Sequence, residues 1–282
     1  MNIPNFSPEM LLKKYHIRAD KGLGQNFLHD PSALNNIINS AEISKSDTIL
    51  EIGPGLGSLT HFLANSAKQV VSVELDHDLV RVMQNEMADY SNVRIIEGDI
   101  LRFSPAELMG NENFLVVANV PYYITSAIFR HLLDKPPRPS RIVMTIQKEV
   151  AERICAKPGD MSLLTLSIQV FGQPKITHII PAEAFHPIPR VDSAIIRIDI
   201  MPEPAIETEL LYSFFHLAKA GFSQKRKTLR NSLSAGLRLT SAETVSLLEK
   251  SSIDPMRRAE SLSINEWAGL TRNYQHAQEK KG

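Results

Sequence analysis

Cysteine is almost absent from this sequence, because Cys155 is the only one among 282 residues. A single thiol excludes a disulfide framework and fits a reducing compartment. Long apolar runs are also absent, and the longest ones fall far short of the roughly 20 residues that a membrane span needs. The N-terminus lacks the apolar region of a signal peptide. We therefore expect a cytoplasmic protein without a membrane segment.

The sequence has no net charge, since 31 basic residues balance 31 acidic ones. Total charge therefore says nothing about a polyanionic partner, and only the distribution of charge can indicate one. Two kinds of catalytic motif are missing as well. The nine histidines are dispersed and no cysteine cluster exists, so we expect no metal site. There is also no Gly-x-Ser-x-Gly nucleophile elbow.

The first part of the chain alternates short apolar runs with helical patterns. The runs are rich in β-branched residues and cover 48–52, 70–74, 93–97, 114–118 and 141–146. The helical patterns cover 30–41, 58–66, 76–88, 125–133 and 148–156. Such runs suit a parallel sheet that is covered on both faces. The alternation predicts a doubly wound α/β fold.

The pattern changes after residue 160. Two more strands are expected in 163–172 and 193–200, and the proline-rich segment 201–205 then ends the pattern. Only helices are indicated beyond it, two of them preceded by the capping-box spacings Thr240–Glu243 and Ser263–Glu266. We therefore expect an α/β domain, 1–203, followed by a small all-helical domain, 204–282.

Three alternate glycines follow the first expected strand. Gly53, Gly55 and Gly57 are more glycines than an ordinary strand–helix turn requires, which predicts a ligand close to the backbone. Their G-x-G-x-G spacing differs from the G-x-G-x-x-G of dinucleotide-binding proteins. Glu51, just before the loop, would face a diphosphate unfavourably but suits a ligand with positive charge, such as S-adenosylmethionine. An NAD-dependent oxidoreductase is therefore disfavoured.

Acidic residues also end the next two strands. Glu74 stands 21 positions after Gly53, where a carboxylate can accept hydrogen bonds from ribose hydroxyls. Asp99 ends the third strand, where it can accept from the exocyclic amine of an adenine ring. Either acid alone could be a solvated surface residue. Three acids at successive strand ends around one glycine loop predict a binding pocket for S-adenosylmethionine.

The fourth strand ends in the sequence Asn-Val-Pro-Tyr-Tyr-Ile, 119–124. The exocyclic amine of adenine is a poor nucleophile, and two acceptors on its N–H groups would localise its lone pair. The Asn119 side-chain oxygen and the Val120 carbonyl, left free because Pro121 cannot continue a helix, can be these acceptors. Tyr122 offers a face on which a flipped base can stack, worth about 1–3 kcal/mol. Tyr123 could equally be a packing aromatic.

Together these motifs resemble those of the ribosomal RNA adenine N6,N6-dimethyltransferases. Asn-Val-Pro-Tyr is similar to the Asn-Leu-Pro-Tyr signature of that family, with Val120 in place of the usual leucine. Tyr123 stands where asparagine or glutamine is frequent. Further segments match the family in order, namely 22–28, 51–60, 73–76, 98–101 and 185–194, and 221–233 resembles the signature of its helical domain.

The resemblance implies a Rossmann-like class I methyltransferase that dimethylates the N6 amine of adenosines. Its cofactor-binding residues would be Asn26, Leu28, Gly53, Gly55, Glu74, Asp99 and Asn119. Its catalytic residues would be Asn119, Val120, Pro121, Tyr122 and Phe185. Phe185 would cover the face of the target adenine opposite Tyr122, and the alternative is a hydrophobic plug beneath its loop.

Acidic residues are absent between 210 and 242, where the sequence has six basic residues. Such a block suits phosphate contacts, although a solvated helix face is the ordinary alternative. The residues that we select for RNA binding are Lys225, Arg226, Lys227 and Arg230. The basic N-terminal segment, 1–21, is either flexible and in contact with RNA or a solubilising tail.

For the substrate, the resemblance implies two adjacent adenosines near the 3′ end of small-subunit (16S) ribosomal RNA. It also implies that a monomeric enzyme acts on a partly assembled 30S particle during ribosome biogenesis. One alternative is the large-subunit dimethyltransferase that confers macrolide resistance. The other is a non-catalytic ribosome-assembly factor on the same fold, against which the intact set of acids, Asn119 and Tyr122 argues.

Overall fold

The computed structural model describes residues 7–110 and 112–279, and the chain forms two compact units. The first unit comprises the chain up to Ala151 together with Pro174–Ile200. The second comprises Glu152–Gln173 and the chain from Met201 onward. The sequence placed a single boundary after residue 203. The chain instead crosses between the units three times: residues 152–173 belong to the helical unit, 174–200 return to the first unit, and the chain from 201 onward belongs to the helical unit again.

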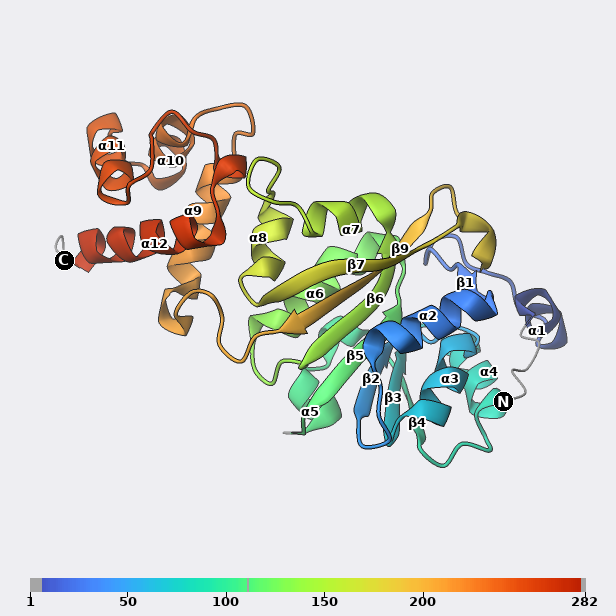
Figure 1. Ribbon diagram of the computed structural model, residues 1–282. Helices are drawn as coiled ribbons and strands as arrows, with labels where there is room; N and C mark the ends of the chain where they lie inside the picture. The colour runs from blue at the N-terminus through green and yellow to red at the C-terminus, as the bar shows by residue number, and fades with distance from the viewer. Residues whose placement is uncertain (1–6, 111, 280–282) are drawn as a thin grey trace. The chain divides into compact units, whose positions relative to one another are not determined.

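A seven-stranded sheet forms the centre of the first unit (Figure 1). Its strand order is β4-β3-β2-β5-β6-β9-β7. The strands are β2 Thr48–Ile52, β3 Gln69–Glu74, β4 Val93–Glu97, β5 Phe114–Asn119, β6 Arg141–Gln147, β7 Gly172–Ile180 and β9 Ser193–Ile200. The pairs from β4 to β6 are parallel, and β9 runs antiparallel to β6. The predicted α/β class is therefore confirmed. The five strands predicted between residues 48 and 146 are also confirmed, as β2 to β6.

The strand order reverses beside β2, which pairs with β3 on one side and with β5 on the other. In open α/β sheets, ligands bind outside the carboxyl ends of the strands at such a switch point. The loop after β2 carries the three glycines, and β5 ends at Asn119. The topology therefore brings the glycine loop and the Asn-Val-Pro-Tyr motif to the same edge of the sheet.

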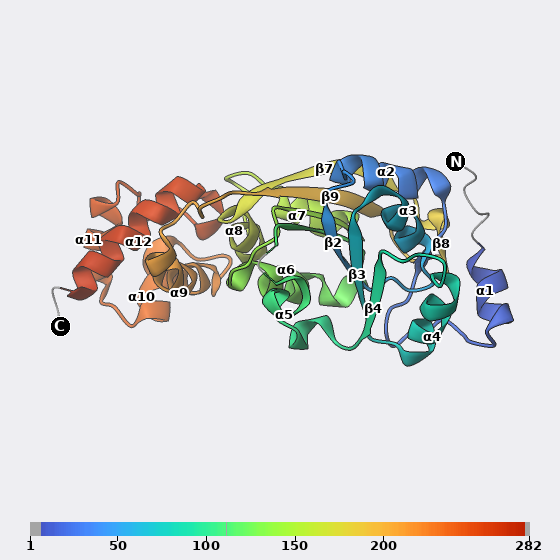
Figure 2. The same ribbon diagram turned by 90° about the horizontal axis from the view of Figure 1, so that it is seen from below.

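Helices cover both faces of this sheet. The α-helices between residues 7 and 154 are α1 Pro8–Lys14, α2 Pro31–Ala41, α3 Ser58–Ser66, α4 His77–Glu86, α5 Pro105–Met109, α6 Thr125–Asp134 and α7 Lys148–Ile154. Figure 2 shows α2 and α3 on one face and α6 on the opposite face. The α2–α3 side is sealed by an apolar cluster that includes Leu34, Ile37, Leu59 and Leu63. None of the helices in the described part of the chain is both long and apolar enough to cross a membrane.

The second unit is helical. Its helices are α8 Leu163–Gln169, α9 Leu211–Phe222, α10 Leu229–Leu237, α11 Ser241–Lys250 and α12 Ile264–Glu279. Their buried side chains include Phe214, Leu217, Leu233, Leu248 and Trp267. The capping box at Thr240–Glu243 is confirmed, and the bonds between Ser263 and Glu266 are reciprocal as well.

The strand predicted for 163–172 is wrong, because most of it is the helix α8. Ser162 and Thr165 form a capping box, in which each side chain bonds to the backbone N–H of the other. The Thr165 hydroxyl also donates to the Arg153 carbonyl at 2.7 Å. These local bonds favour the helix over the β-propensity of the apolar run.

Candidate active site

The glycine loop between β2 and α3 needs glycine for steric reasons. Gly53, Gly55 and Gly57 all have positive φ angles, at 66°, 61° and 88°. A Cβ on Gly55 would lie 3.1 Å from the Phe27 ring, and one on Gly57 would lie 2.8 Å from the Met83 sulfur. Side chains at these positions would therefore clash as well as strain the backbone. The loop exposes bare backbone to the space above the sheet edge.

The Glu74 carboxylate holds this loop in place. Its Oε2 accepts the Gly55 N–H at 3.0 Å, and its Oε1 accepts the Asp76 N–H at 3.0 Å. The side chain is only 6 % exposed, and this burial raises its pKa although the backbone N–H groups partly oppose the shift. Each oxygen keeps a second lone pair, so the carboxylate can still accept hydrogen bonds from the two hydroxyls of a ribose.

Glu51 is a buried carboxylate with one unsatisfied oxygen. Its Oε2 accepts from the hydroxyls of Thr60 at 2.8 Å and Ser72 at 2.7 Å. Its Oε1 has no hydrogen-bond partner among the described residues, although the residue is only 1 % exposed and lines the pocket. Burial raises the pKa of Glu51 to about 7. An unpartnered carboxylate oxygen in this place suits the ammonium group of S-adenosylmethionine.

We predict that Glu51→Gln changes the pH dependence of stability. A carboxyl whose folded pKa exceeds its unfolded pKa stabilises the fold fully below the unfolded value, and this contribution is lost as the pH rises through the folded pKa. Relative to Glu51→Gln, the wild-type protein should lose on the order of 3 kcal/mol between pH 4 and pH 8. Urea unfolding of both proteins across this range measures the difference. If the stabilities of the two proteins changed in parallel with pH, the raised pKa of Glu51 would be contradicted.

The segment 20–28, which we call the N-terminal strap, closes over the glycine loop. Its last two residues form β1, Phe27–Leu28, which pairs antiparallel with β8, Phe185–His186. The Gln25 side chain donates to the Asp76 carboxylate at 2.7 Å and so ties the strap to the end of β3. The basic N-terminal segment contains α1, which precedes the strap in the chain. The Lys14 side chain of α1 donates a hydrogen bond to the Glu86 carboxylate at 2.7 Å. Residues 1–6 of that segment lie outside the described residues.

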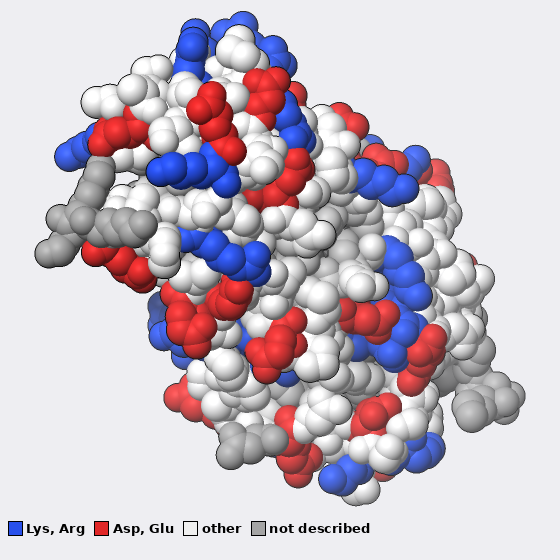
Figure 3. All heavy atoms as spheres, turned by 60° about the vertical axis from the view of Figure 1, so that its left-hand side comes forward, with Lys and Arg blue, Asp and Glu red and all other residues white. Residues whose placement is uncertain are grey.

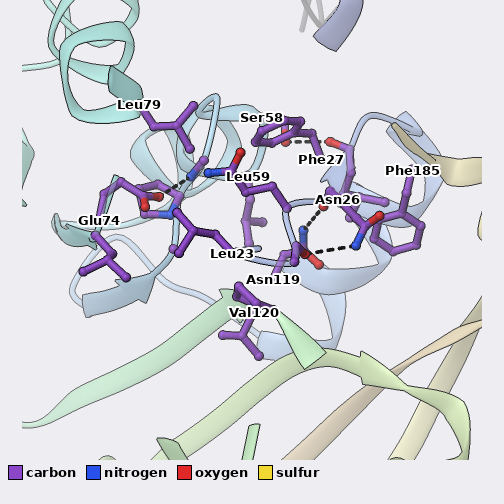
Figure 4. A pocket seen from close by; sticks show the side chains of 18 of the residues that line it. Leu23, Asn26, Phe27, Ser58, Leu59, Glu74, Leu79, Asn119, Val120 and Phe185 are labelled. Atoms are coloured by element: carbon purple, nitrogen blue, oxygen red, sulfur yellow. Dashed lines mark hydrogen bonds between the residues drawn. The ribbon is translucent and has the colours of Figure 1, made fainter. Parts of the chain in front are cut away.

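The Asn119 amide is oriented by the strap. Its Nδ2 donates to the Asn26 carbonyl at 3.3 Å, and the Asn26 amide donates in turn to the Gly24 carbonyl at 3.0 Å (Figure 4). Because the amide nitrogen is engaged with the strap, the oxygen is the part of the side chain left to accept hydrogen bonds from a ligand. Val120 follows with a side chain that is buried, so it presents only its backbone.

The two tyrosines of the motif differ in environment. The Tyr122 hydroxyl lies 2.8 Å from the Ser193 hydroxyl, and Ser193 is fully buried at the start of β9. Partial burial raises the pKa of Tyr122. Tyr123 is exposed, although it lines the same pocket. The first ring is therefore fixed by a hydrogen bond, whereas the second faces solvent.

Phe185 is buried to 1 % exposure, within the apolar cluster that contains Leu28 and Leu34. It also lines the pocket, and Figure 4 shows its ring on the side of Asn26 and Asn119. Such burial is also what the alternative role, a hydrophobic plug beneath its loop, would show. Stacking of Phe185 on a target base stays a prediction.

One pocket gathers most of the predicted residues in an empty volume of about 770 Å³, open solvent at its mouth included. Those that line it are Asn26, Leu28, Gly53, Gly55, Glu74, Asn119, Val120, Pro121, Tyr122 and Phe185. Sequence reasoning missed other lining residues, among them Leu23, Gln25, Leu75 and Leu79. The leucines carry no distinctive sequence signal, because apolar residues of this kind are usually core residues.

Asp99 does not line this pocket. It follows β4, the edge strand of the sheet, and its Oδ1 accepts the Leu101 N–H at 3.0 Å to cap the short helix Ile100–Arg102. Its side chain is partly exposed, so it stays available to a ligand that extends past β3. Its contact with the adenine of the cofactor therefore remains a prediction.

The candidate RNA-binding residues lie in the second unit. Lys225, Arg226 and Lys227 are exposed in the turn between α9 and α10. Arg230 lies in the first turn of α10, where its Nε is buried without a partner among the described residues. Figure 3 shows one face of the molecule, on which Lys and Arg side chains form separate small groups rather than one continuous patch.

The described part of the chain contains no group of three or more His, Cys, Asp or Glu residues that could hold a metal ion. A Rossmann-like sheet with a glycine loop and buried acids at the ends of two adjacent strands defines a methyltransferase that uses S-adenosylmethionine. A family model described as ribosomal RNA adenine dimethylase matches residues 17–275. The chain belongs to the ribosomal RNA adenine dimethylase family.

Individual relatives agree with this assignment. Two proteins named ribosomal RNA small subunit methyltransferase A are similar over nearly their whole length. The one from Dehalococcoides mccartyi strain CBDB1 is 45 % identical over 265 residues, which are 94 % of this chain and 91 % of the relative. The one from Clostridium botulinum strain Langeland is 42 % identical over 264 residues, 93 % of this chain and 96 % of the relative.

Two solved structures share the fold. A dimethyladenosine transferase from Plasmodium falciparum has a TM-score of 0.77 at 25 % identity, covering 89 % of this chain and 98 % of that one. The 23S rRNA methyltransferase ErmE has a TM-score of 0.71 at 27 % identity, covering 89 % and 100 %. The predictions of an adenine dimethyltransferase, an S-adenosylmethionine cofactor and a ribosomal RNA substrate are thus confirmed.

Proposed function

We propose that this enzyme dimethylates the N6 amines of two adjacent adenosines near the 3′ end of small-subunit (16S) ribosomal RNA. The observation that carries the proposal is the 45 % identity, over 94 % of this chain, to a relative named for the small subunit. The similarity to ErmE, named for 23S rRNA, is 27 %. The small-subunit assignment is therefore favoured over the macrolide-resistance type.

Within the pocket, we assign Glu74 to the ribose of the cofactor and Glu51 to its amino group. Gly53 and Gly55 would approach it through their backbone, and Asn26 and Leu28 would cover it from the strap. S-adenosylmethionine supplies an electrophilic methyl group on a sulfonium. Leu75, which is half exposed in the pocket wall, offers an apolar surface to the adenine ring of the cofactor, and Asp99 would accept from its exocyclic amine.

The target amine would lie at the end of β5. The Asn119 Oδ1 accepts one of its hydrogens and the Val120 carbonyl accepts the other, so that the nitrogen lone pair is localised and directed toward the cofactor side of the pocket. Pro121 keeps the Val120 carbonyl out of a helix. No strong base is required, because a methylated adenine cation is acidic. The contribution of the protein is positioning and electrostatic preorganisation.

The target adenosine must leave its RNA stack to reach this site. Tyr122 would receive one face of the base, and its bond to Ser193 keeps the ring in position. Phe185 would close the pocket on the other side. The buried position of Phe185 implies that it acts mainly by shaping the wall of the pocket.

The turn between α9 and α10 would contact RNA phosphates through Lys225, Arg226 and Lys227, with Arg230 beside them. We further propose that the substrate is a partly assembled 30S particle in the cytoplasm and that the enzyme acts as a monomer without a metal. The N6,N6-dimethylation would then belong to ribosome biogenesis. The exposed lysine and arginine side chains of this turn, with no acids in the surrounding sequence, support the contact with RNA phosphates.

The proposal is tested by mapping N6,N6-dimethyladenosine in ribosomal RNA from cells with and without the gene. Primer extension should stop at two adjacent adenosines near the 3′ end of 16S rRNA in the presence of the gene. Both stops should vanish without it and return with a plasmid copy. A gene-dependent stop in 23S rRNA instead would contradict the small-subunit assignment.

A further inference from the structure

The second tyrosine of the catalytic motif is unusually exposed for an aromatic residue. Tyr123 is 63 % exposed, although it lines the same pocket as Tyr122. Among the Phe, Tyr and Trp residues within 7–110 and 112–279, the only other exposed side chain is Tyr212, which is 83 % exposed on α9. The functions assigned above to Asn119, Val120 and Tyr122 leave Tyr123 without a role.

The two adjacent tyrosine rings are held by different parts of the molecule. Tyr122 bonds through its hydroxyl to Ser193 at the start of β9. The Tyr123 ring instead lies against the strap, with its Cδ1 3.4 Å from the position that a Cβ on Gly24 would occupy. Consecutive Cα atoms are about 3.8 Å apart, so the two rings are neighbours that face different surroundings. One ring belongs to the pocket wall and the other to its rim.

Extraction of a base from an RNA strand has a consequence for the adjacent nucleotide. When the target adenosine flips into the pocket, its neighbour loses a stacking partner and exposes an aromatic face to water. Aromatic side chains compensate for such a loss because every nucleobase has a face that can stack, whatever its sequence. Tyr123 presents an exposed ring one residue from the ring assigned to the target.

We propose that Tyr123 forms a second nucleobase subsite, on which the base next to the target adenosine stacks while the target occupies the pocket. This inference rests on the proposed function, since it requires an RNA adenosine in the pocket. The alternative role for Tyr123 is structural, as a support for the strap through Gly24. The two roles differ in the ligand that they affect, because the strap covers the cofactor whereas the subsite binds RNA.

The test combines protein variants with RNAs that lack one base. Small subunits are reconstituted with 16S rRNA in which each base next to the target adenosine is either present or replaced by an abasic nucleotide. The proteins are the wild type, Tyr123→Phe, Tyr123→Ala and, as a matched exposed tyrosine in the other unit, Tyr212→Ala. KM for RNA and kcat are measured for methyl transfer, and the Kd of S-adenosylmethionine is measured by calorimetry.

Removal of one of the two neighbouring bases should raise the KM for RNA of the wild type but not that of Tyr123→Ala. The rise in the wild type should be about tenfold, the low end of the range for loss of one stacked base. Tyr123→Ala should raise KM by a similar factor with intact RNA and show no further rise with the abasic RNA. Tyr123→Phe and Tyr212→Ala should respond to the abasic RNA as the wild type does, and the Kd of the cofactor should stay unchanged in Tyr123→Ala.

Two results would overturn the subsite while methyl transfer by the wild type stays intact. One is that the abasic nucleotide raises KM by the same factor in the wild type and in Tyr123→Ala. The other is a Tyr123→Ala variant whose main defect is a weaker Kd for S-adenosylmethionine, since that outcome assigns Tyr123 to the strap. A wild-type protein that transfers no methyl group to small subunits whose RNA has all its bases would instead refute the proposed function, and the subsite with it.

Discussion

Replacement of Asn119 by alanine is expected to lower kcat for methyl transfer about 100- to 1000-fold, as is typical when one preorganised polar contact to the reacting group is lost. The variant removes the oxygen that we assign to the target amine. It also removes the bond from the Asn119 Nδ2 to the Asn26 carbonyl, which orients the side chain. Single-turnover assays with 16S rRNA in small subunits measure the loss.

The matched control is Asn92→Ala. The Asn92 amide also donates to backbone carbonyls, those of Ala64 and Ala67, but Asn92 does not line the pocket. It should lower stability without a change in kcat. Binding of Asn119→Ala to small subunits should remain close to that of the wild type, since the basic turn before α10 is intact. A near wild-type rate for Asn119→Ala would refute the proposed mechanism.

Glu74→Gln is expected to weaken binding of S-adenosylmethionine about 100-fold. The carboxylate accepts two backbone N–H groups, from Gly55 and Asp76, one on each oxygen. A carboxamide has only one oxygen, so one of these N–H groups loses its acceptor. A buried N–H left without its acceptor costs about 1–3 kcal/mol, and the acceptor for the ribose hydroxyls is weakened at the same time. Calorimetric titration of the cofactor gives the Kd directly.

Glu97→Gln is the matched control for this variant. Glu97 is also a glutamate, and it lies opposite Glu74 on the neighbouring strand β4. Its side chain is half exposed, and among the described residues its carboxylate forms hydrogen bonds with the exposed His77 ring. Cofactor affinity should therefore be unchanged in Glu97→Gln. An equal loss of affinity in both variants would show that the Glu74 effect is not local.

The sheet could be predicted because buried parallel strands carry a strong local signal. The run 114–118 is continuous and apolar, and 48–52 is rich in β-branched residues and apolar except for Thr48 and Glu51; they became β5 and β2 with almost the expected bounds. In contrast, the residues 163–169 are also rich in leucine and isoleucine but form a helix, since the capping bonds of Ser162 and Thr165 decide the local structure. β7 is an edge strand with mixed exposure and a proline, so its sequence lacks the signal of a central strand.

The site was predictable where function requires a particular residue type at a turn. The glycines of the loop and Glu74 are such residues, because the positive φ angles of the loop favour glycine and the two N–H groups need a side chain with two acceptor oxygens. Contacts between distant segments were not predictable. The Gln25–Asp76 and Tyr122–Ser193 bonds join residues 51 and 71 positions apart, and neither pair has a spacing that marks it.

A crystal structure of the protein with S-adenosylhomocysteine and adenosine tests the central claim most directly. The account predicts that the adenosine N6 lies within hydrogen-bond distance of the Asn119 Oδ1 and the Val120 carbonyl oxygen. The base should stack on Tyr122, with N6 turned toward the cofactor sulfur. An Asn119 amide that presents its nitrogen to the base, or a purine bound outside this pocket, would contradict the account.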